Sequence, residues 1–161
     1  MAGPNTDSPS HTIVGWREWV SLPGLHVPWV KAKLDTGARS SAIHAFDIDV
    51  FERDGGDWVR YSIHPWQRSA DEAVACESQV IGQRSIRSSS GHSDVRYVVA
   101  MDVFLAGRSV IAEVTRRRRD EMGFRMLVGR EALRQRFLVD PGRSYLGGRP
   151  PRSVRRQNRG G

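Results

Sequence analysis

Hydrophobic and polar residues alternate along most of the chain, in segments bounded by Gly, Pro or Asp. Alternation with a period of two places successive side chains on opposite faces of an extended strand, so the pattern predicts a mainly β fold. Pro23-Gly24, Gly55-Gly56 and Ala106-Gly107 are typical of turns between strands. The predicted strands are Thr12 to Leu22, Val27 to Leu34, Ile43 to Phe51, Trp58 to Pro65, Glu77 to Arg87, Val95 to Leu105, Arg108 to Thr115, Arg125 to Val128 and Arg136 to Asp140.

Two segments depart from this alternation. The segment from Arg130 to Arg136 reads Arg-Glu-Ala-Leu-Arg-Gln-Arg and is rich in helix formers, which predicts a short helix directly after Gly129. The segment from Gln67 to Ala75 has no clear periodicity and is expected to be an excursion between strands.

Length and composition favour one soluble domain. A chain of 161 residues suits a single core, which we place at 13–148, between a disordered polar leader at 1–12 and a basic disordered tail at 149–161. The formal net charge is +7, and the tail holds five arginines and no acids. No apolar run approaches the roughly 20 residues that cross a bilayer, and the leader lacks the features of a secretory signal. The single cysteine, Cys76, cannot form an internal disulfide, so we expect a cytoplasmic protein.

The chemistry concentrates where the strand from Val30 ends abruptly in Asp35-Thr36-Gly37. A strand that runs into a glycine turn holds a carboxylate on a stiff support and lets other backbone approach it closely. These three letters alone are typical of an ordinary turn. A second segment, Phe124 to Leu133, is an apolar strand that ends in Gly129 and enters the predicted helix, and the combination is much more specific than either half.

The two segments together resemble the retropepsins. Leu34-Asp-Thr-Gly-Ala38 matches their first motif, and Leu127-Val-Gly-Arg-Glu-Ala-Leu133 matches their second, in the same order and at a comparable separation. A closer resemblance joins the chain to a bacterial group labelled "ATP-dependent zinc protease", through the segments Ile13 to Pro23, Lys31 to His44 and Arg87 to His92. The resemblance implies a retropepsin-like (acid protease) closed barrel with one short C-terminal helix.

The same resemblance implies an activity and partners. Members of this group are associated with an ATP-grasp ligase that adds glutamates to the C-terminus of a small-subunit ribosomal protein. The implied role is therefore a peptidase that trims glutamate-rich tails, with the ligase as a further expected partner.

An aspartic peptidase holds a water between two carboxylates that share one proton. One carboxylate takes the proton of the attacking water, and the other protonates the scissile carbonyl oxygen. Because this chain supplies one Asp-Thr-Gly, a symmetric homodimer must contribute the second Asp35. By resemblance, Thr36 braces the loop by a hydrogen bond to the opposite loop, and the backbone of Gly37 faces the substrate.

A lid is expected over the site, from Gln83 to Arg96, because Ser88-Ser-Ser-Gly-His-Ser93 interrupts two strand-like arms. A plain hairpin turn is the competing interpretation. The residues expected to contact substrate are Ala38, Arg39, Arg87, Ser90, Gly91, His92 and Arg96.

The substrate is inferred from the sign of the charges. Retroviral enzymes carry an acid directly after the first motif, whereas this chain has Arg39 there, and Arg87 and Arg96 lie on the lid arms. These arginines favour an acidic peptide, held by charge-assisted hydrogen bonds. Arg39 has a second possible role, an internal ion pair with Glu131, and both roles stay open.

The sequence favours no metal and no other cofactor. The five histidines lack zinc-site spacing such as His-Glu-x-x-His, and the chain contains no phosphate-binding glycine loop for ATP. His44 is expected to be structural, with proton transfer as the alternative.

Two functions of other classes remain. The chain is alternatively a noncatalytic module that binds acidic peptides or the ligase. It is otherwise a binder of ribosome or RNA surfaces through the 149–161 tail, which would attract nucleic acid only weakly.

Overall fold

The structure is a computed structural model that describes residues 11–66, 72–87, 90–91, 93–105, 108–115, 124–134 and 136–158, with the backbone alone for Ile86 and Arg87. Residues 1–10 of the predicted leader, residues 67–71 of the predicted excursion and the Ala106-Gly107 turn lie outside this part. The elements are β1 (Thr12–Leu22), η1 (Pro23–Leu25), β2 (Val27–Asp35), β3 (Ser41–His44), β4 (Phe46–Arg53), β5 (Gly56–Ile63), β6 (Val74–Arg87), β7 (Ser93–Val103), β8 (Arg108–Thr115), β9 (Met126–Gly129), α1 (Arg130–Leu133), β10 (Phe137–Ser144) and α2 (Arg152–Asn158).

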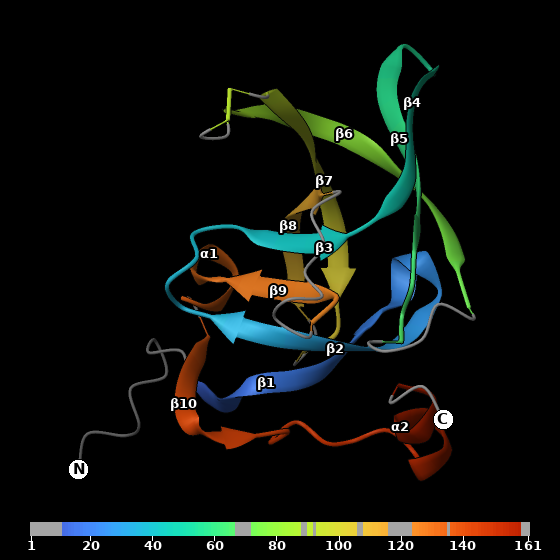
Figure 1. The fold of residues 1–161 in the computed structure, drawn as a ribbon. Helices are drawn as coiled ribbons and strands as arrows, with labels where there is room; N and C mark the ends of the chain where they lie inside the picture. The colour runs from blue at the N-terminus through green and yellow to red at the C-terminus, as the bar shows by residue number, and fades with distance from the viewer. Residues whose placement is uncertain are drawn as a thin grey trace, which may run out of the picture.

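The mainly β prediction is confirmed. Within the described residues, the strands form one sheet in the order β10-β1-β2-β9-β3-β8-β7-β6-β5-β4 (Figure 1). The pairs β1–β10, β2–β9 and β3–β8 are parallel, and the other pairs are antiparallel. The predicted short helix after Gly129 is α1, which begins at Arg130.

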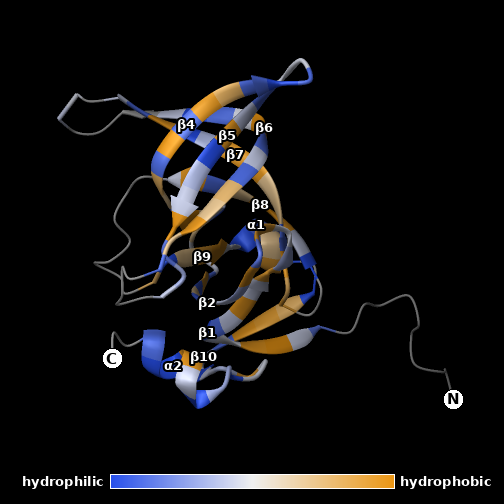
Figure 2. Cartoon of the chain, turned by 90° about the vertical axis from the view of Figure 1, so that its right-hand side faces the viewer, coloured by the Kyte–Doolittle hydropathy of each residue, from blue (hydrophilic) through white to orange (hydrophobic). Residues whose placement is uncertain are grey.

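The alternation of the sequence becomes an inner and an outer face of this sheet. Figure 2 shows it as hydrophobic and hydrophilic bands along the strands. Val20, Val30, Val99 and Val114, from four different strands, are each 1% exposed or less in one hydrophobic core. Burying one such side chain contributes about 1.5–3 kcal/mol to folding, so the core fixes the register that positions the strand ends.

The closed barrel expected from the resemblance is not confirmed. The outermost strands of the sheet are β10 and β4, which do not pair with each other. Between Ser21 and Phe104, two backbone hydrogen bonds of 2.8 and 3.4 Å form an isolated bridge from the end of β1 to the end of β7. Because β10 occupies the free edge of β1, and β5 with β4 extends the sheet beyond β6, the strand order stays open.

The strand predicted from Ile43 to Phe51 is two strands in the structure. β3 pairs with β8 and β9, whereas β4 pairs with β5, and the buried Ala45 separates the two. Asp47 adopts a left-handed backbone conformation with φ of 52° beside the irregular register that begins β4. The alternation of polar and apolar residues continues through this segment, but the pairing partners change, so one predicted strand becomes two.

The prediction of a disordered tail at 149–161 is wrong for the part that forms α2. Pro150 and Pro151 precede the helix, and Pro151 accepts backbone hydrogen bonds from Val154 and Arg155 at 3.0 and 3.1 Å. Proline favours a helix start because it needs no N–H partner there. Asn158 is buried at the other end of the helix, so part of the tail packs on the body. No helix in the described segments is long and apolar enough to cross a bilayer.

The buried carboxylate of Glu18 on β1 accepts hydrogen bonds from the segment that follows β10. Glu18 is 0% exposed, and its Oε2 accepts hydrogen bonds from the backbone N–H groups of Gly15 at 2.7 Å and Leu146 at 2.9 Å. Its Oε1 accepts from the N–H of Gly147 at 2.9 Å. These bonds hold the segment between β10 and α2 against β1.

We expect Glu18→Gln to lower the free energy of unfolding by about 1.5–3 kcal/mol, because the amide NH₂ would meet an N–H donor where a carboxylate oxygen now accepts. Urea denaturation followed by tryptophan fluorescence measures the change. Glu52→Gln, at an exposed site on β4, is the control and should stay within about 0.5 kcal/mol of the parent. Equal stability of the two variants would show that these bonds contribute nothing.

Candidate active site

Asp35 is the last residue of β2, and its side chain is partly exposed at the strand end. One carboxylate oxygen, Oδ1, accepts a hydrogen bond from the backbone N–H of Gly37 at 2.9 Å, and the Asp35 carbonyl accepts one from Ala38 at 3.3 Å. This tight turn fixes the orientation of the carboxylate. No other hydrogen bond to its oxygens comes from the described residues, so Oδ2 can bind a water.

The loop after Asp35 lies against β9 and the start of α1. β2 and β9 run in parallel, with Asp35 opposite Gly129. Four hydrogen bonds hold the loop. Two join backbone groups, from Arg130 N–H to the Ala38 carbonyl at 2.6 Å and from Glu131 N–H to the Arg39 carbonyl at 3.1 Å. Two involve side chains, from Gly129 N–H to Ser41 Oγ at 3.0 Å and from Arg130 Nη1 to the Thr36 carbonyl at 3.4 Å. The two motifs that the sequence singled out are therefore in direct contact.

Gly129 is required by the closeness of this contact. A Cβ atom at this position would lie 2.5 Å from both the carbonyl carbon and the oxygen of Ser40, and 3.0 Å from the Ala38 carbonyl oxygen. All three atoms belong to backbone, which cannot move aside as the end of a flexible side chain can. The second motif thus needs glycine where the Asp35 loop crosses it.

The ion pair proposed between Arg39 and Glu131 does not form. Glu131 accepts instead from Arg134, one turn along α1, at 3.4 Å, and both side chains are exposed. Arg39 is exposed, and its guanidinium pairs with no acid in the described part of the chain. The backbone carbonyl of Arg39 accepts a hydrogen bond from α1, while its side chain is exposed.

The predicted lid is a hairpin made by the ends of β6 and β7. Ile86 pairs with Asp94 and Arg87 with Ser93, and Gly91 in the tip has a positive φ of 83°. Ser90 and Gly91 are exposed. His92 and the side chain of Arg87 lie outside the described residues, so their substrate contacts stay predictions.

Arg96 was expected to contact substrate, but the structure gives it a structural ion pair. Its side chain is buried, and Nη1 lies 3.3 Å from Oε2 of the buried Glu113 on β8. Arg84, opposite Arg96 on β6, binds the other oxygen of the same carboxylate. The Arg84 Nη1 also donates to Ser40 Oγ at 3.4 Å, which links an arm of the hairpin to the Asp35 loop.

The roles of Arg84 and Glu113, and the support of the loop by Ser41, were not predicted from the sequence. One signal was present, since Glu113 is a charged residue inside the apolar strand β8, and a buried charge needs a partner. The partners themselves come from two other strands, and no spacing in the sequence identifies them.

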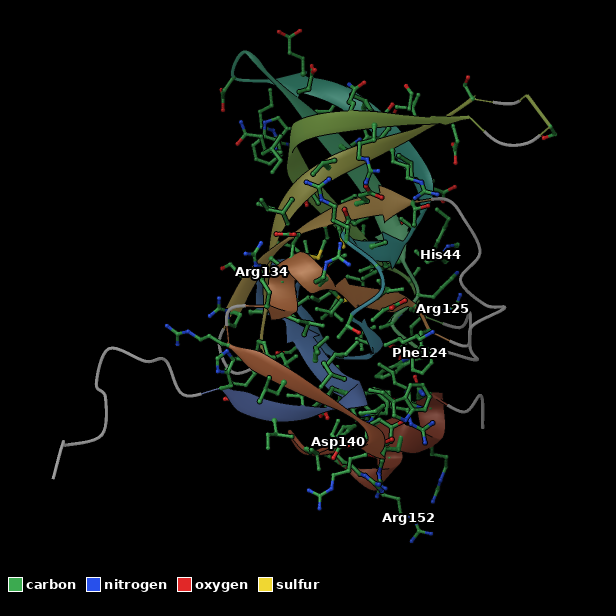
Figure 3. All side chains as sticks on the ribbon, turned by 90° about the vertical axis from the view of Figure 1, so that its left-hand side faces the viewer. His44, Phe124, Arg125, Arg134, Asp140 and Arg152 are labelled. Carbon is green, nitrogen blue, oxygen red and sulfur yellow. The ribbon has the colours of Figure 1, made fainter. Side chains whose placement is uncertain are left out.

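Two other potentially reactive residues, Cys76 and His44, are buried. Burial raises the pKa of the Cys76 thiol to about 11, so this cysteine is protonated at neutral pH and a poor nucleophile. His44 is buried at the end of β3, and its backbone N–H donates to the Arg125 carbonyl at 2.9 Å (Figure 3). Among the described residues, no three His, Cys, Asp or Glu side chains gather in a group that could hold a metal ion.

Comparison with known proteins finds relatives that are similar in amino-acid sequence. Two proteins named probable alpha-L-glutamate ligase, from Shewanella pealeana and Parasynechococcus marenigrum, are 47% and 45% identical to this chain over 133 residues. Each match covers 83% of this chain but only 29% and 28% of the respective relative. The chain thus spans less than a third of the length of these ligases.

A solved structure and a family model also match. The crystal structure of a Legionella pneumophila protein of unknown function superposes with a TM-score of 0.69 at 26% sequence identity, covering 85% of this chain and 98% of that one. The model of the RimB-like family, described as retropepsin-like aspartic endopeptidase RimB, matches residues 13–150. That match includes β2, β9 and the loop between Asp35 and Ser41, so the chain belongs to the RimB-like family of retropepsin-like aspartic endopeptidases.

Proposed function

We propose that two copies of this chain pair to form an aspartic endopeptidase, in which the Asp35 carboxylates of both copies activate one water. The observation that carries the proposal is the Asp35 turn, which leaves one carboxylate oxygen open at a strand end and is clamped by the second motif of the family. In the paired site, one carboxylate removes a proton from the attacking water and the other protonates the scissile carbonyl oxygen. Thr36 and Gly37 continue the turn, with Thr36 bracing the opposite loop.

The substrate is an acidic peptide, because two lysines lie on the same strand face as the Asp35 carboxylate. Lys31 and Lys33 are partly exposed and share one face of β2 with Asp35, whereas Ala32 and Leu34 between them are buried. Arg39 adds an exposed guanidinium immediately after the turn. Side-chain carboxylates of a glutamate-rich chain match these charges through charge-assisted hydrogen bonds.

The names of the relatives suggest a biological process in which an acidic peptide would be the substrate. A segment similar to this chain occurs within proteins named probable alpha-L-glutamate ligase. A peptidase paired with a glutamate ligase would remove what the ligase adds. We propose that this chain trims glutamate-rich C-terminal tails that an ATP-grasp ligase builds on a small-subunit ribosomal protein, in the cytoplasm.

Incubating the purified protein with a glutamate-tailed peptide, and reading the products by mass spectrometry, tests this function. We expect shortened peptides from the parent protein and none from Asp35→Asn. A matched peptide with glutamine in place of glutamate should be cleaved at least about tenfold more slowly, because it lacks the charges that the cations bind. Binding of the tail without any cleavage would favour the noncatalytic module instead.

A further inference from the structure

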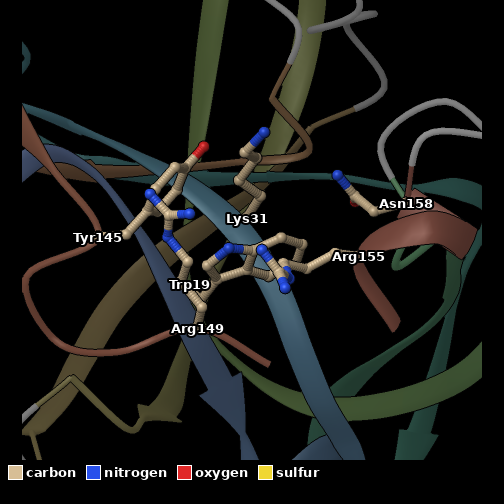
Figure 4. A pocket seen from close by; sticks show the side chains of 6 residues that line it. All are labelled: Trp19, Lys31, Tyr145, Arg149, Arg155 and Asn158. Atoms are coloured by element: carbon tan, nitrogen blue, oxygen red, sulfur yellow. The ribbon is translucent and has the colours of Figure 1, made fainter. Parts of the chain in front are cut away.

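A small cavity lies where α2 meets the outer face of β1 and β2, away from the Asp35 turn. Its volume is about 60 Å³, which is enough to admit a carboxylate group, since one water needs about 10–15 Å³. Figure 4 shows side chains from four parts of the chain converging on it. The lining residues are Trp19, Lys31, Tyr145, Arg149, Arg155 and Asn158.

The cavity is strongly positive. Lys31, Arg149 and Arg155 line it, no acid does, and none of the three cations pairs with an acid in the described part of the chain. Lys31 Nζ lies 5.8 Å from the ring centre of Trp19 and 5.5 Å from that of Tyr145, and the Arg149 guanidinium lies 5.1 Å from the Tyr145 ring. The aromatic rings thus hold Lys31 and Arg149 in place without neutralising them.

One of these cations carries a buried donor atom. The Nε atom of Arg155 is buried and has no hydrogen-bond partner among the described residues. A buried donor without a partner costs free energy, and the cost is larger on a charged group. An oxyanion in the cavity would neutralise the excess charge and can accept from the guanidinium groups.

One residue of the cavity lining, Lys31, lies on β2, the strand that ends at Asp35. Lys31 precedes Asp35 by four residues on the same strand face, a separation of about 13 Å at 3.3 Å per residue. Lys33 lies between them and pairs with Arg17 on the neighbouring strand β1. A peptide in extended conformation has the same rise per residue, so about four residues of a bound chain span the distance from Asp35 to Lys31.

We propose that this cavity binds a carboxylate of the acidic peptide substrate, about four residues from the bond that is cleaved, as a second anchoring point. The proposal rests on the function proposed above and adds a specificity site to it. A peptide carboxylate is favoured over a nucleic-acid phosphate because the cavity continues the cationic strand face that begins at Asp35.

Binding of acetylated octaglutamate to the Asp35→Asn protein, measured by calorimetry, tests the site without requiring cleavage. Arg155→Gln should weaken binding at least about tenfold, since one charge-assisted hydrogen bond is lost. Arg152→Gln is the matched control, because Arg152 is an exposed arginine of the same helix and does not line the cavity (Figure 3). Its effect should stay within about twofold.

Lys31→Gln provides a second variant that leaves α2 intact, and it should weaken binding to a similar extent. Equal effects of Arg152→Gln and Arg155→Gln, or no effect of Arg155→Gln and Lys31→Gln, would overturn the site. Arg155-dependent binding of a single-stranded RNA oligonucleotide, with octaglutamate binding unchanged, would overturn it in favour of a nucleic-acid site. If the parent protein cleaves no glutamate peptide but Arg155-dependent binding persists, the proposed function fails and the site stands.

Discussion

Asp35→Asn should lower kcat for a glutamate-tailed peptide at least about a thousandfold. General acid–base catalysis contributes about 10²–10⁴-fold, and this substitution removes both the base and the acid of a paired site, since each copy carries the change. An asparagine has nearly the same shape and can still accept the hydrogen bond that the Gly37 N–H now donates. The loop should therefore keep its conformation, and circular dichroism and thermal unfolding should match those of the parent protein.

Mixing the two proteins reveals whether both carboxylates are needed. If each active site takes one Asp35 from each copy, subunits that exchange freely at fixed total concentration give activity that falls as the square of the parent fraction. An equal mixture then retains about one quarter of the activity, against about one half if each copy works alone. Sedimentation velocity at the assay concentration must find dimers in both samples. A linear decline would refute the paired site.

The parts of the fold that the sequence predicted are those with a local cause. Alternation, together with the Pro23-Gly24 and Ala106-Gly107 turn signals, located β1 from Thr12 to Leu22 and β8 from Arg108 to Thr115 with the boundaries that the structure has. Glycine marked the end of β9 and the start of α1, because it permits the close approach that the loop makes there. Each of these features follows from residues near one another in the chain.

The features that the sequence did not predict depend on partners far away along the chain. Nothing local distinguishes Arg96, which is buried on Glu113, from Arg39, which is exposed, because only the meeting of β7 with β8 decides between them. α2 forms in a segment rich in arginine and proline, but its Asn158 end packs on the body. The cavity at Arg155 was equally hidden, since it combines β1, β2, the segment after β10 and α2.

Gly129→Ala should destabilise the protein by about 1–3 kcal/mol or more and reduce activity even in the molecules that stay folded. The added methyl would lie 2.5 Å from the Ser40 backbone, so either β9 or the Asp35 loop must shift. A displaced loop misaligns the carboxylate, and a misplacement of 1 Å can cost about 10²-fold in rate. Gly24→Ala is the control, because its methyl would meet no atom closer than 3.8 Å. Urea denaturation and kcat measured below the unfolding transition separate the two effects. Full activity and parental stability of Gly129→Ala would mean that the crossing of the two motifs does not position Asp35.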